Sequence, residues 1–341
     1  MKNVINYFYN LNIDNLRMIH NNYYFIYRDK KFVFQEIRTL HFDYHSVYEL
    51  NKILMNNNES YFQIIINKNN DILTYAFNKK YILMLDNTPK DRNFNFYDLL
   101  KTNIIVPDSN KIIDRLNRSN WIYLWEKKID YFEYFIEHNI NKYVHFNKYV
   151  NYFIGLGENA ILYVKNTIDS LNPSYYDQVV ISHSRIETNS SLKQLYNPLN
   201  LVIDHPSRDI AEYLKMLFWN RCYKKLDIRK YLNEIKLSNY GARLLIARML
   251  FPSFCFDSFE KLVENEINEN DILHIIDRIE EYEEYLLTVY FNLKLKYTIP
   301  EISWLKKVDY SSTLTTPSTS GTSFISIDSI PSLSVTSIML Q

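Results

Sequence analysis

The chain has 341 residues, 47% of them apolar, and its 39 Lys and Arg side chains balance 39 Asp and Glu side chains. This length predicts two lobes or domains around a large core. The neutral balance excludes a strongly basic nucleic-acid footprint over the whole chain, but it leaves a local basic patch open because Lys and Arg are scattered throughout. The chain has only 4 glycines, where ordinary usage would give about 24, which excludes the glycine-rich loops that cradle phosphates in Walker, Rossmann and kinase motifs.

The N-terminal part predicts a small lobe of mixed helix and antiparallel sheet. Aromatic and branched runs flank the polar turn Arg28–Lys31 and predict a β-hairpin over residues 22–37. Apolar residues at helical spacing follow over 43–56. Three further strands are predicted at 61–66, 72–77 and 81–85. We place this small lobe at residues 1–87, followed by a hinge.

Helical patterns dominate beyond the hinge, and we place a larger helical lobe at residues 88–309. Its predicted helices lie at 95–102, 109–138 with a break near 117–120, 142–167, 209–223, 227–235, 239–250, 257–265 and 270–293. Short strands are predicted at 178–182 and 200–204. Residues 310–341 are rich in Ser and Thr and nearly uncharged, which is typical of a disordered tail.

Cysteine usage and hydropathy indicate where the protein resides. Cys222 and Cys255 lie in separate helical patterns, and we expect buried, reduced thiols in a cytosolic protein rather than a disulfide. The N-terminus lacks the apolar core of a signal peptide. No apolar run approaches the ~18 residues of a membrane span. We therefore expect no membrane span and no nucleic-acid partner.

The most specific motif is the segment from Leu201 to Lys215. It predicts a buried strand that ends in Asp204, a tight turn, and an amphipathic helix. Asp209 and Glu212 have the spacing of a capping box, with Asp209 at the N-cap and Glu212 reaching back, so we expect both to be structural. His183 lies just upstream, at the end of the preceding predicted strand.

This α+β arrangement resembles the two-lobed protein-kinase-like fold, in which a small antiparallel-sheet lobe precedes a larger helical lobe. The aminoglycoside-phosphotransferase and choline-kinase branch is the most similar. Leu156–Tyr163 and Asp204–Glu212 resemble segments of the CotS/YutH-type spore-coat-associated proteins. The resemblance covers residues 1–308. It implies spore-coat or other protein partners and a location in the mother-cell cytoplasm and the spore coat.

The resemblance also identifies a catalytic loop that has lost its chemistry. Active relatives place an aspartate two residues after the loop histidine, and an asparagine five residues further on helps to hold Mg²⁺. Here His183 matches the histidine, Arg185 replaces the aspartate, and Asn189 is one place off because Ser190 takes the asparagine position. A guanidinium stays protonated and cannot act as a general base. Glu187 is the nearby acid that could substitute, but we expect no catalytic residue and a structural role for His183.

Two further positions concern nucleotide and metal. Gln35 takes the place of the phosphate-binding lysine, and an uncharged amide cannot neutralise phosphate, although Gln35 remains the candidate cofactor-binding residue. Glu49, the lysine's expected partner, is then a surface acid. Asp204 matches the metal-holding aspartate, and it either ligates Mg²⁺ or caps the turn. Arg208 and Arg185 either attract an anion near the cleft or form salt bridges with nearby acids.

These observations predict a catalytically inactive kinase-like protein that serves spore assembly as a binding surface, with no cofactor expected. The alternative is a small-molecule phosphotransferase that uses ATP and Mg²⁺ and an alcohol acceptor. In that alternative Asp204 would hold the metal and Glu187 would orient the acceptor hydroxyl. A third possibility is an interaction protein that acts through its C-terminal tail.

Overall fold

The computed structural model describes residues 1–19, 21–37, 43–57, 60–106, 113–139, 142–143, 146–186 and 191–306. Residues 1–300 form one compact unit, and the described part of a second unit holds the short 3-10 helix η5 (Ser303–Lys306). The predicted tail at 310–341 lies outside the described residues. Among the helices that the structure describes, none is long and apolar enough to cross a membrane.

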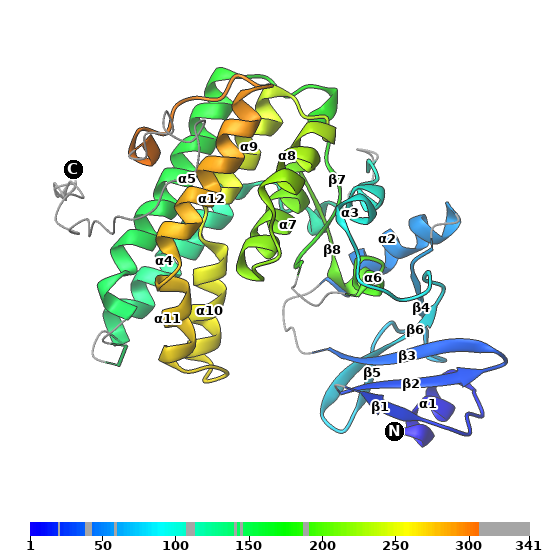
Figure 1. Cartoon of the computed structure of the whole chain (residues 1–341). Coiled ribbons are helices and arrows are strands. Elements are labelled where there is room, and N and C mark those ends of the chain that lie inside the picture. Colours follow the sequence, from blue (N-terminus) through cyan, green and yellow to red (C-terminus); the bar gives the residue numbers. More distant parts are fainter. Residues whose placement is uncertain are drawn as a thin grey trace, which may run out of the picture. The chain divides into compact units, whose positions relative to one another are not determined.

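The small lobe is built on an antiparallel sheet with the strand order β1-β2-β3-β6-β4, in which β5 also pairs with β6 (Figure 1). Arg28 and Asp29 both have positive φ, which closes the β2–β3 hairpin with a two-residue turn. The elements are α1 (Lys2–Tyr9), β1 (Arg17–Ile19), β2 (Asn22–Tyr27), β3 (Lys30–Ile37), α2 (Tyr44–Asn56), β4 (Phe62–Ile65), β5 (Thr74–Ala76) and β6 (Lys79–Asp86). The predicted hairpin, helix and three strands are confirmed, whereas α1 and β1 were not predicted.

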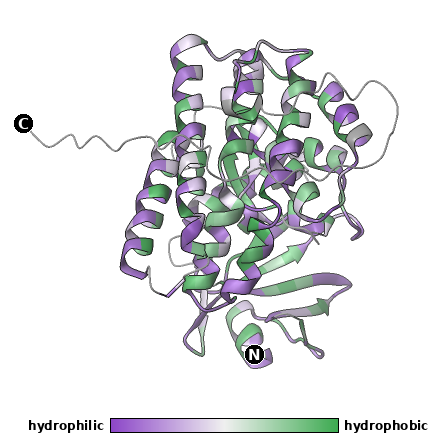
Figure 2. Cartoon of the chain, turned by 60° about the vertical axis from the view of Figure 1, so that its left-hand side comes forward, coloured by the Kyte–Doolittle hydropathy of each residue, from purple (hydrophilic) through white to green (hydrophobic). Residues whose placement is uncertain are grey.

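The large lobe is mainly helical, and its helices carry both hydrophilic and hydrophobic residues along their length (Figure 2). Its helices are α3 (Phe96–Thr102), α4 (Trp121–Asn139), α5 (Val150–Ser170), α6 (Leu192–Leu195), α7 (Ser207–Trp219), α8 (Lys225–Glu234), α9 (Asn239–Leu250), α10 (Ser253–Val263), α11 (Glu269–Ile276) and α12 (Ile279–Lys294). The 3-10 turns are η1 (Ile113–Leu116), η2 (Phe146–Lys148), η3 (Tyr175–Asp177) and η4 (Pro198–Asn200). The predicted break after η1 is confirmed, and the helix predicted at 270–293 is two helices.

One apolar core joins the two lobes. Val33 and Ile64 of the small-lobe sheet pack in the same buried cluster as Ile181, Leu201 and Ile203 of the large lobe. The last three residues belong to the short strands β7 (Val180–His183) and β8 (Leu201–Asp204). These strands therefore lie where the lobes meet, and their ends are held by packing from both sides. The two-lobed α+β fold is as predicted, and the lobe boundary at residue 87 stays a prediction.

The two thiols differ in exposure. Cys255 is buried in α10, and burial raises the pKa of its thiol. Cys222 is exposed, and both cysteines are free. The expectation of two buried thiols is therefore wrong for Cys222. The reason is that α7 ends at Trp219, three residues before it, and the chain turns at Arg221, which has positive φ.

Candidate functional site

The candidate site lies at the ends of the two short strands of the large lobe, where the sequence analysis places the catalytic-loop and metal-binding positions. β7 ends at His183 and β8 ends at Asp204, and the strands pair antiparallel. Helix α7 begins at Ser207, directly after β8, and packs against β7. The candidate site is therefore built from one strand pair and the first turn of one helix.

The carboxylate of Asp204 is fully buried and surrounded by donors. Its Oδ1 accepts hydrogen bonds from the Trp121 indole N–H at 2.8 Å and from the His205 backbone N–H at 2.7 Å. Its Oδ2 accepts from Nη1 of Arg208 at 2.7 Å, one helical turn along the chain. Burial opposes the charge on the guanidinium, but Asp204 and Glu212 raise the pKa of Arg208 and keep it protonated. Asp204 is thus neutralised from within the protein.

Asp209 binds the loop histidine. Its Oδ2 lies 2.7 Å from Nδ1 of His183, and its Oδ1 accepts from the His183 backbone N–H at 2.9 Å. Nε2 of His183 lies 3.0 Å from the Leu195 carbonyl oxygen, so the ring is fixed at both nitrogens. The capping box expected of Asp209 and Glu212 is wrong, because α7 begins before Asp209 with Pro206 at the N-cap and no side-chain cap.

Arg185 lies at the exposed edge of this site. Its side chain is 57% exposed, and its Nη2 donates to Oδ1 of Asp257 at 3.1 Å. Its Nη1 donates to the Ser184 carbonyl at 3.1 Å, and Nη2 of Arg208 donates to the same carbonyl at 3.3 Å. The structure therefore brings the two arginines together, and each has an acidic partner. Arg185 is thus an exposed cation at the position where the resemblance predicts a catalytic aspartate.

A second buried charge cluster lies behind Asp204. Oε1 of Glu212 accepts from Nε of Arg248 at 3.0 Å and from Nζ of Lys215 at 3.5 Å. Burial disfavours both charges and lowers the pKa of Lys215 to about 8, whereas Lys215 and Arg248 overcome the burial of Glu212 and lower its pKa to about 2. The Arg248 guanidinium lies 4.9 Å from the centre of the Trp121 ring. The indole that donates to the site aspartate is therefore held on its face as well as at its edge.

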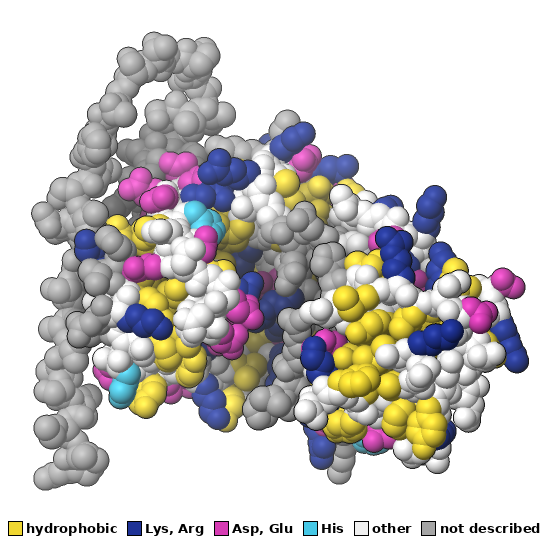
Figure 3. All heavy atoms as spheres, turned by 90° about the horizontal axis from the view of Figure 1, so that it is seen from below, with side chains coloured by type: hydrophobic (Ala, Val, Ile, Leu, Met, Phe, Trp, Pro, Cys, Tyr) yellow, Lys and Arg dark blue, Asp and Glu magenta, His cyan; other side chains and the backbone are white. Residues whose placement is uncertain are grey.

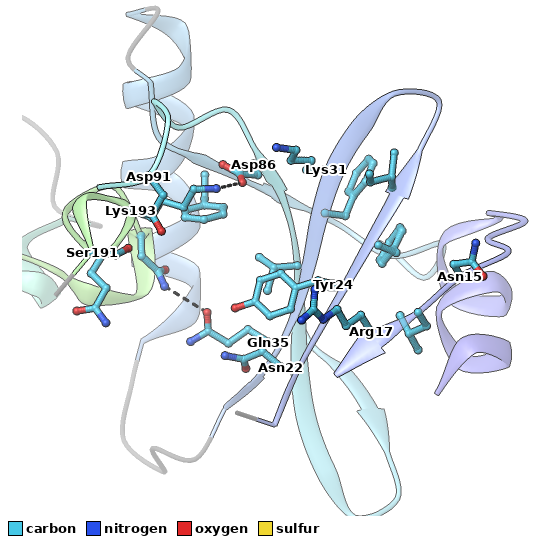
Figure 4. A pocket seen from close by; sticks show the side chains of 18 of the residues that line it. Asn15, Arg17, Asn22, Tyr24, Lys31, Gln35, Asp86, Asp91, Ser191 and Lys193 are labelled. Atoms are coloured by element: carbon cyan, nitrogen blue, oxygen red, sulfur yellow. Dashed lines mark hydrogen bonds and ion pairs between the residues drawn. The ribbon is translucent and has the colours of Figure 1, made fainter. Parts of the chain in front are cut away.

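Gln35 lines a cleft between the small-lobe sheet and the segment around α6 (Figure 4). The cleft has a volume of about 930 Å³. Oε1 of Gln35 accepts from Nδ2 of Asn197 at 3.2 Å, which links the two lobes across the cleft. Glu49 forms a salt bridge of 2.7 Å with Lys52 on its own helix and is not part of this cleft.

The connection between β1 and β2 contains no glycine. β1 and β2 are joined at positions 20 and 21, Ile19 pairs with Asn22, and Asn21 has a φ of 64°. Kinase-like enzymes place their glycine-rich loop between these strands. This connection therefore offers no glycine that could let backbone N–H groups approach a phosphate.

The described side chains do not fit a magnesium site. Among the described residues, no three His, Cys, Asp or Glu side chains gather closely enough to hold a metal. The oxygens of Asp204 already accept four hydrogen bonds, one of them from a guanidinium. Glu187 and Asn189, the other predicted loop positions, lie outside the described residues.

Comparison with known proteins places these features in a family. A family model described as "Spore coat putative kinase YutH" matches residues 2–289. The chain belongs to this spore-coat family. It is 32% identical over 208 residues to the endospore coat-associated protein YutH of Bacillus subtilis, and the match covers 55% of this chain and 61% of that relative. The matched part is thus less than two thirds of the curated relative.

Solved structures agree with the fold of this YutH-family chain. An aminoglycoside phosphotransferase from Alicyclobacillus acidocaldarius matches 84% of this chain and 93% of its own, with a TM-score of 0.54 and 10% identity. Spectinomycin phosphotransferase in complex with ADP and spectinomycin matches 85% of this chain and 97% of its own, with a TM-score of 0.50 and 12% identity. Identities this low show the fold alone. Both the family and the protein-kinase-like fold predicted from the sequence are confirmed.

Several residues of the YutH-family site carry no signal in the sequence. Trp121 is 83 residues from its acceptor Asp204, so no local pattern joins them. Nε2 of His205 lies 3.1 Å from Oδ1 of Asp177, and the Ser238 hydroxyl donates to the same oxygen at 2.6 Å. Burial opposes the charge of Asp177, but these hydrogen bonds lower its pKa to about 2. The turn that follows Asp204 is therefore anchored by a carboxylate that only the fold brings near.

Proposed function

We propose that this protein is a catalytically inactive member of the YutH family that acts in the spore coat as a binding or assembly scaffold. One observation carries the proposal: the buried carboxylate of Asp204 is paired with Arg208 and bonded to Trp121. A metal ion would have to displace a guanidinium held at 2.7 Å in a site closed to water. The fold then supplies a rigid surface rather than a phosphotransfer centre.

Two substitutions support the same proposal. Gln35 brings an uncharged amide to the cleft where an ammonium would neutralise phosphate, and Arg185 brings a permanent cation where a base is needed. We expect no ATP or Mg²⁺ cofactor. The partners proposed are other proteins of the spore coat, reached from the mother-cell cytoplasm, and the family name is what supports that location.

The second candidate is an ATP- and Mg²⁺-dependent phosphotransferase with an alcohol acceptor. It is favoured by Asp204, which keeps the strand-end position that the metal-holding aspartate has in the fold's enzymes. In this candidate the Asp204–Arg208 pair would open when nucleotide binds. Glu187 would then orient the acceptor hydroxyl.

The deciding experiment follows thermal unfolding with ATP, alone and with Mg²⁺ or Mn²⁺, for the wild type and Asp204→Ala. A ligand present at about 100 times its Kd stabilises the folded state by roughly 2.7 kcal/mol, which raises the Tm of a chain this long by several degrees. The inactive scaffold predicts no metal-dependent rise in either protein. A rise in the wild type that requires the metal and is lost in Asp204→Ala would show that the cleft holds nucleotide through Asp204 and would favour the phosphotransferase instead.

A further inference from the structure

The cleft that contains Gln35 is lined by an unusual combination of side chains. One wall is formed by β1, β2 and β3, and the facing wall includes the segment from Ser191 to Asn197 (Figure 4). Three cations and three carboxylates balance on its walls: Arg17, Lys31, Lys193, Asp14, Asp86 and Asp91. Lys193 forms an ion pair with Asp86. A cleft without net charge favours a ligand without net charge over a triphosphate, which needs a surplus of cations.

Carboxamides supply most of the remaining hydrogen-bonding groups. Asn15, Asn22, Gln35, Gln194 and Asn197 all line the cleft, and each amide offers both donors and an acceptor. Oε1 of Gln35 accepts a hydrogen bond from Nδ2 of Asn197, and Oδ1 of Asn22 accepts one from the Glu36 backbone N–H. The amide nitrogens of Gln35 and Asn22 have no hydrogen-bond partner among the described residues. The cleft thus presents donors and acceptors side by side, the arrangement that pairs with adjacent hydroxyl groups.

An aromatic ring lies among these polar groups. Tyr24 is 39% exposed and sits on the cleft face of β2, where its register partners are Arg17 on β1 and Val33 on β3. Ile26, two residues along the same face, is 65% exposed. On the lower side of this lobe, which is not the side of the cleft, apolar side chains also gather among scattered cations and carboxylates (Figure 3). An exposed ring bordered by carboxamides, carboxylates and a guanidinium can stack on the C–H face of a sugar ring while its neighbours bond the hydroxyls.

We infer that this cleft binds a neutral oligosaccharide, with Tyr24 as the stacking platform and Asn22, Gln35 and Asn197 as hydroxyl partners. The inference rests on the proposed non-catalytic use of the fold and gives that scaffold a ligand class. The volume of about 930 Å³ is enough for two or three sugar rings. Binding requires neither a metal nor Asp204.

The test is isothermal titration calorimetry of the full chain with maltotriose, cellotriose and chitotriose, in the presence of EDTA. At least one trisaccharide binds the wild type, and Tyr24→Ala weakens its affinity by about tenfold because the stacking face is lost. Tyr24→Phe retains the ring and retains the affinity. Tyr75→Ala removes a tyrosine that is 60% exposed in the same lobe but outside the cleft, and it changes nothing.

The inference is overturned if no trisaccharide binds at concentrations up to about 10 mM, if Tyr24→Ala binds as well as the wild type, or if ADP binds more tightly than every sugar. A second measurement separates it from the proposed function. Phosphate transfer from ATP to the bound sugar would disprove the proposed inactivity and leave the oligosaccharide site in place. Sugar binding without transfer supports both.

Discussion

Replacing Arg208 by methionine should destabilise the protein far more than replacing it together with its partner Asp204. The two side chains are 9% and 0% exposed, and the ion pair spans 2.7 Å. Arg208→Met leaves a buried carboxylate with hydrogen bonds but no cation, and losing one partner of a buried pair costs about 3–5 kcal/mol. Asp204→Asn leaves the guanidinium unpaired and costs a similar amount. The double variant contains no buried charge, and its asparagine oxygen still accepts from Trp121.

The magnitude follows from the size of the unit. For the 300 residues of the compact unit, the entropy of unfolding is about 0.6 kcal/mol/K, so a loss of about 4 kcal/mol lowers the Tm by about 6 °C. We expect the double variant to be less destabilised than Arg208→Met alone by at least about 2 kcal/mol. Equilibrium urea unfolding followed by tryptophan fluorescence measures all four proteins. Additive single losses, or single losses below about 0.5 kcal/mol, would refute the neutralised-carboxylate interpretation.

Three further outcomes are expected. Gly241→Ala should destabilise the protein by about 1–3 kcal/mol, because its Cβ would lie 2.9 Å from Oδ1 of the buried Asp177 carboxylate. Gly155→Ala is the matched control: its Cβ meets nothing within 4 Å, so it should stabilise its helix by up to about 1 kcal/mol. Urea unfolding measures both variants. Glu212 has a folded pKa of about 2 against its ordinary 4.5, so its contribution, on the order of 3 kcal/mol, is present above pH 4.5 and lost as the pH falls towards 2. Urea unfolding at several pH values should show a shallower acid dependence in Glu212→Gln, and an unchanged one would contradict the assignment. A maleimide should label Cys222 in the native protein and Cys255 only after unfolding, as mass spectrometry can resolve; native labelling of both thiols would contradict the described burial.

The sequence predicts the elements well where a local pattern is long. The amphipathic helices and the polar turn at Arg28 and Asp29 are strong local signals, and the structure has them within a few residues. Helix α1 spans only eight residues and β1 only three, which is too short for a period to stand out. The prediction of a capping box was wrong. Asp209 and Glu212 have the spacing of a capping box, but in the folded chain Asp209 binds His183 and Glu212 binds Arg248 instead.

The candidate site was predictable in position but not in its bonding. The strand ends at His183 and Asp204 follow from the apolar runs that precede them. Their partners come from elsewhere: the indole of Trp121 and the guanidinium of Arg248 reach the site across separations that no sequence pattern encodes. The sequence left open whether Arg208 attracts an anion or forms a salt bridge. The fold decides this because Asp204 is the nearest buried charge.

Under the proposed function, the position of Arg208 explains how a kinase-like fold can do without a metal and remain stable. The strand-end carboxylate is buried by the architecture, and a buried charge must be neutralised whether or not the protein is an enzyme. In the fold's enzymes a magnesium ion supplies that positive charge. Here a guanidinium one helical turn later supplies it. Under the proposed function, the bond from Arg208 both occupies the carboxylate that a metal would need and removes the stability cost of burying Asp204, so inactivity and a buried aspartate would have one physical cause.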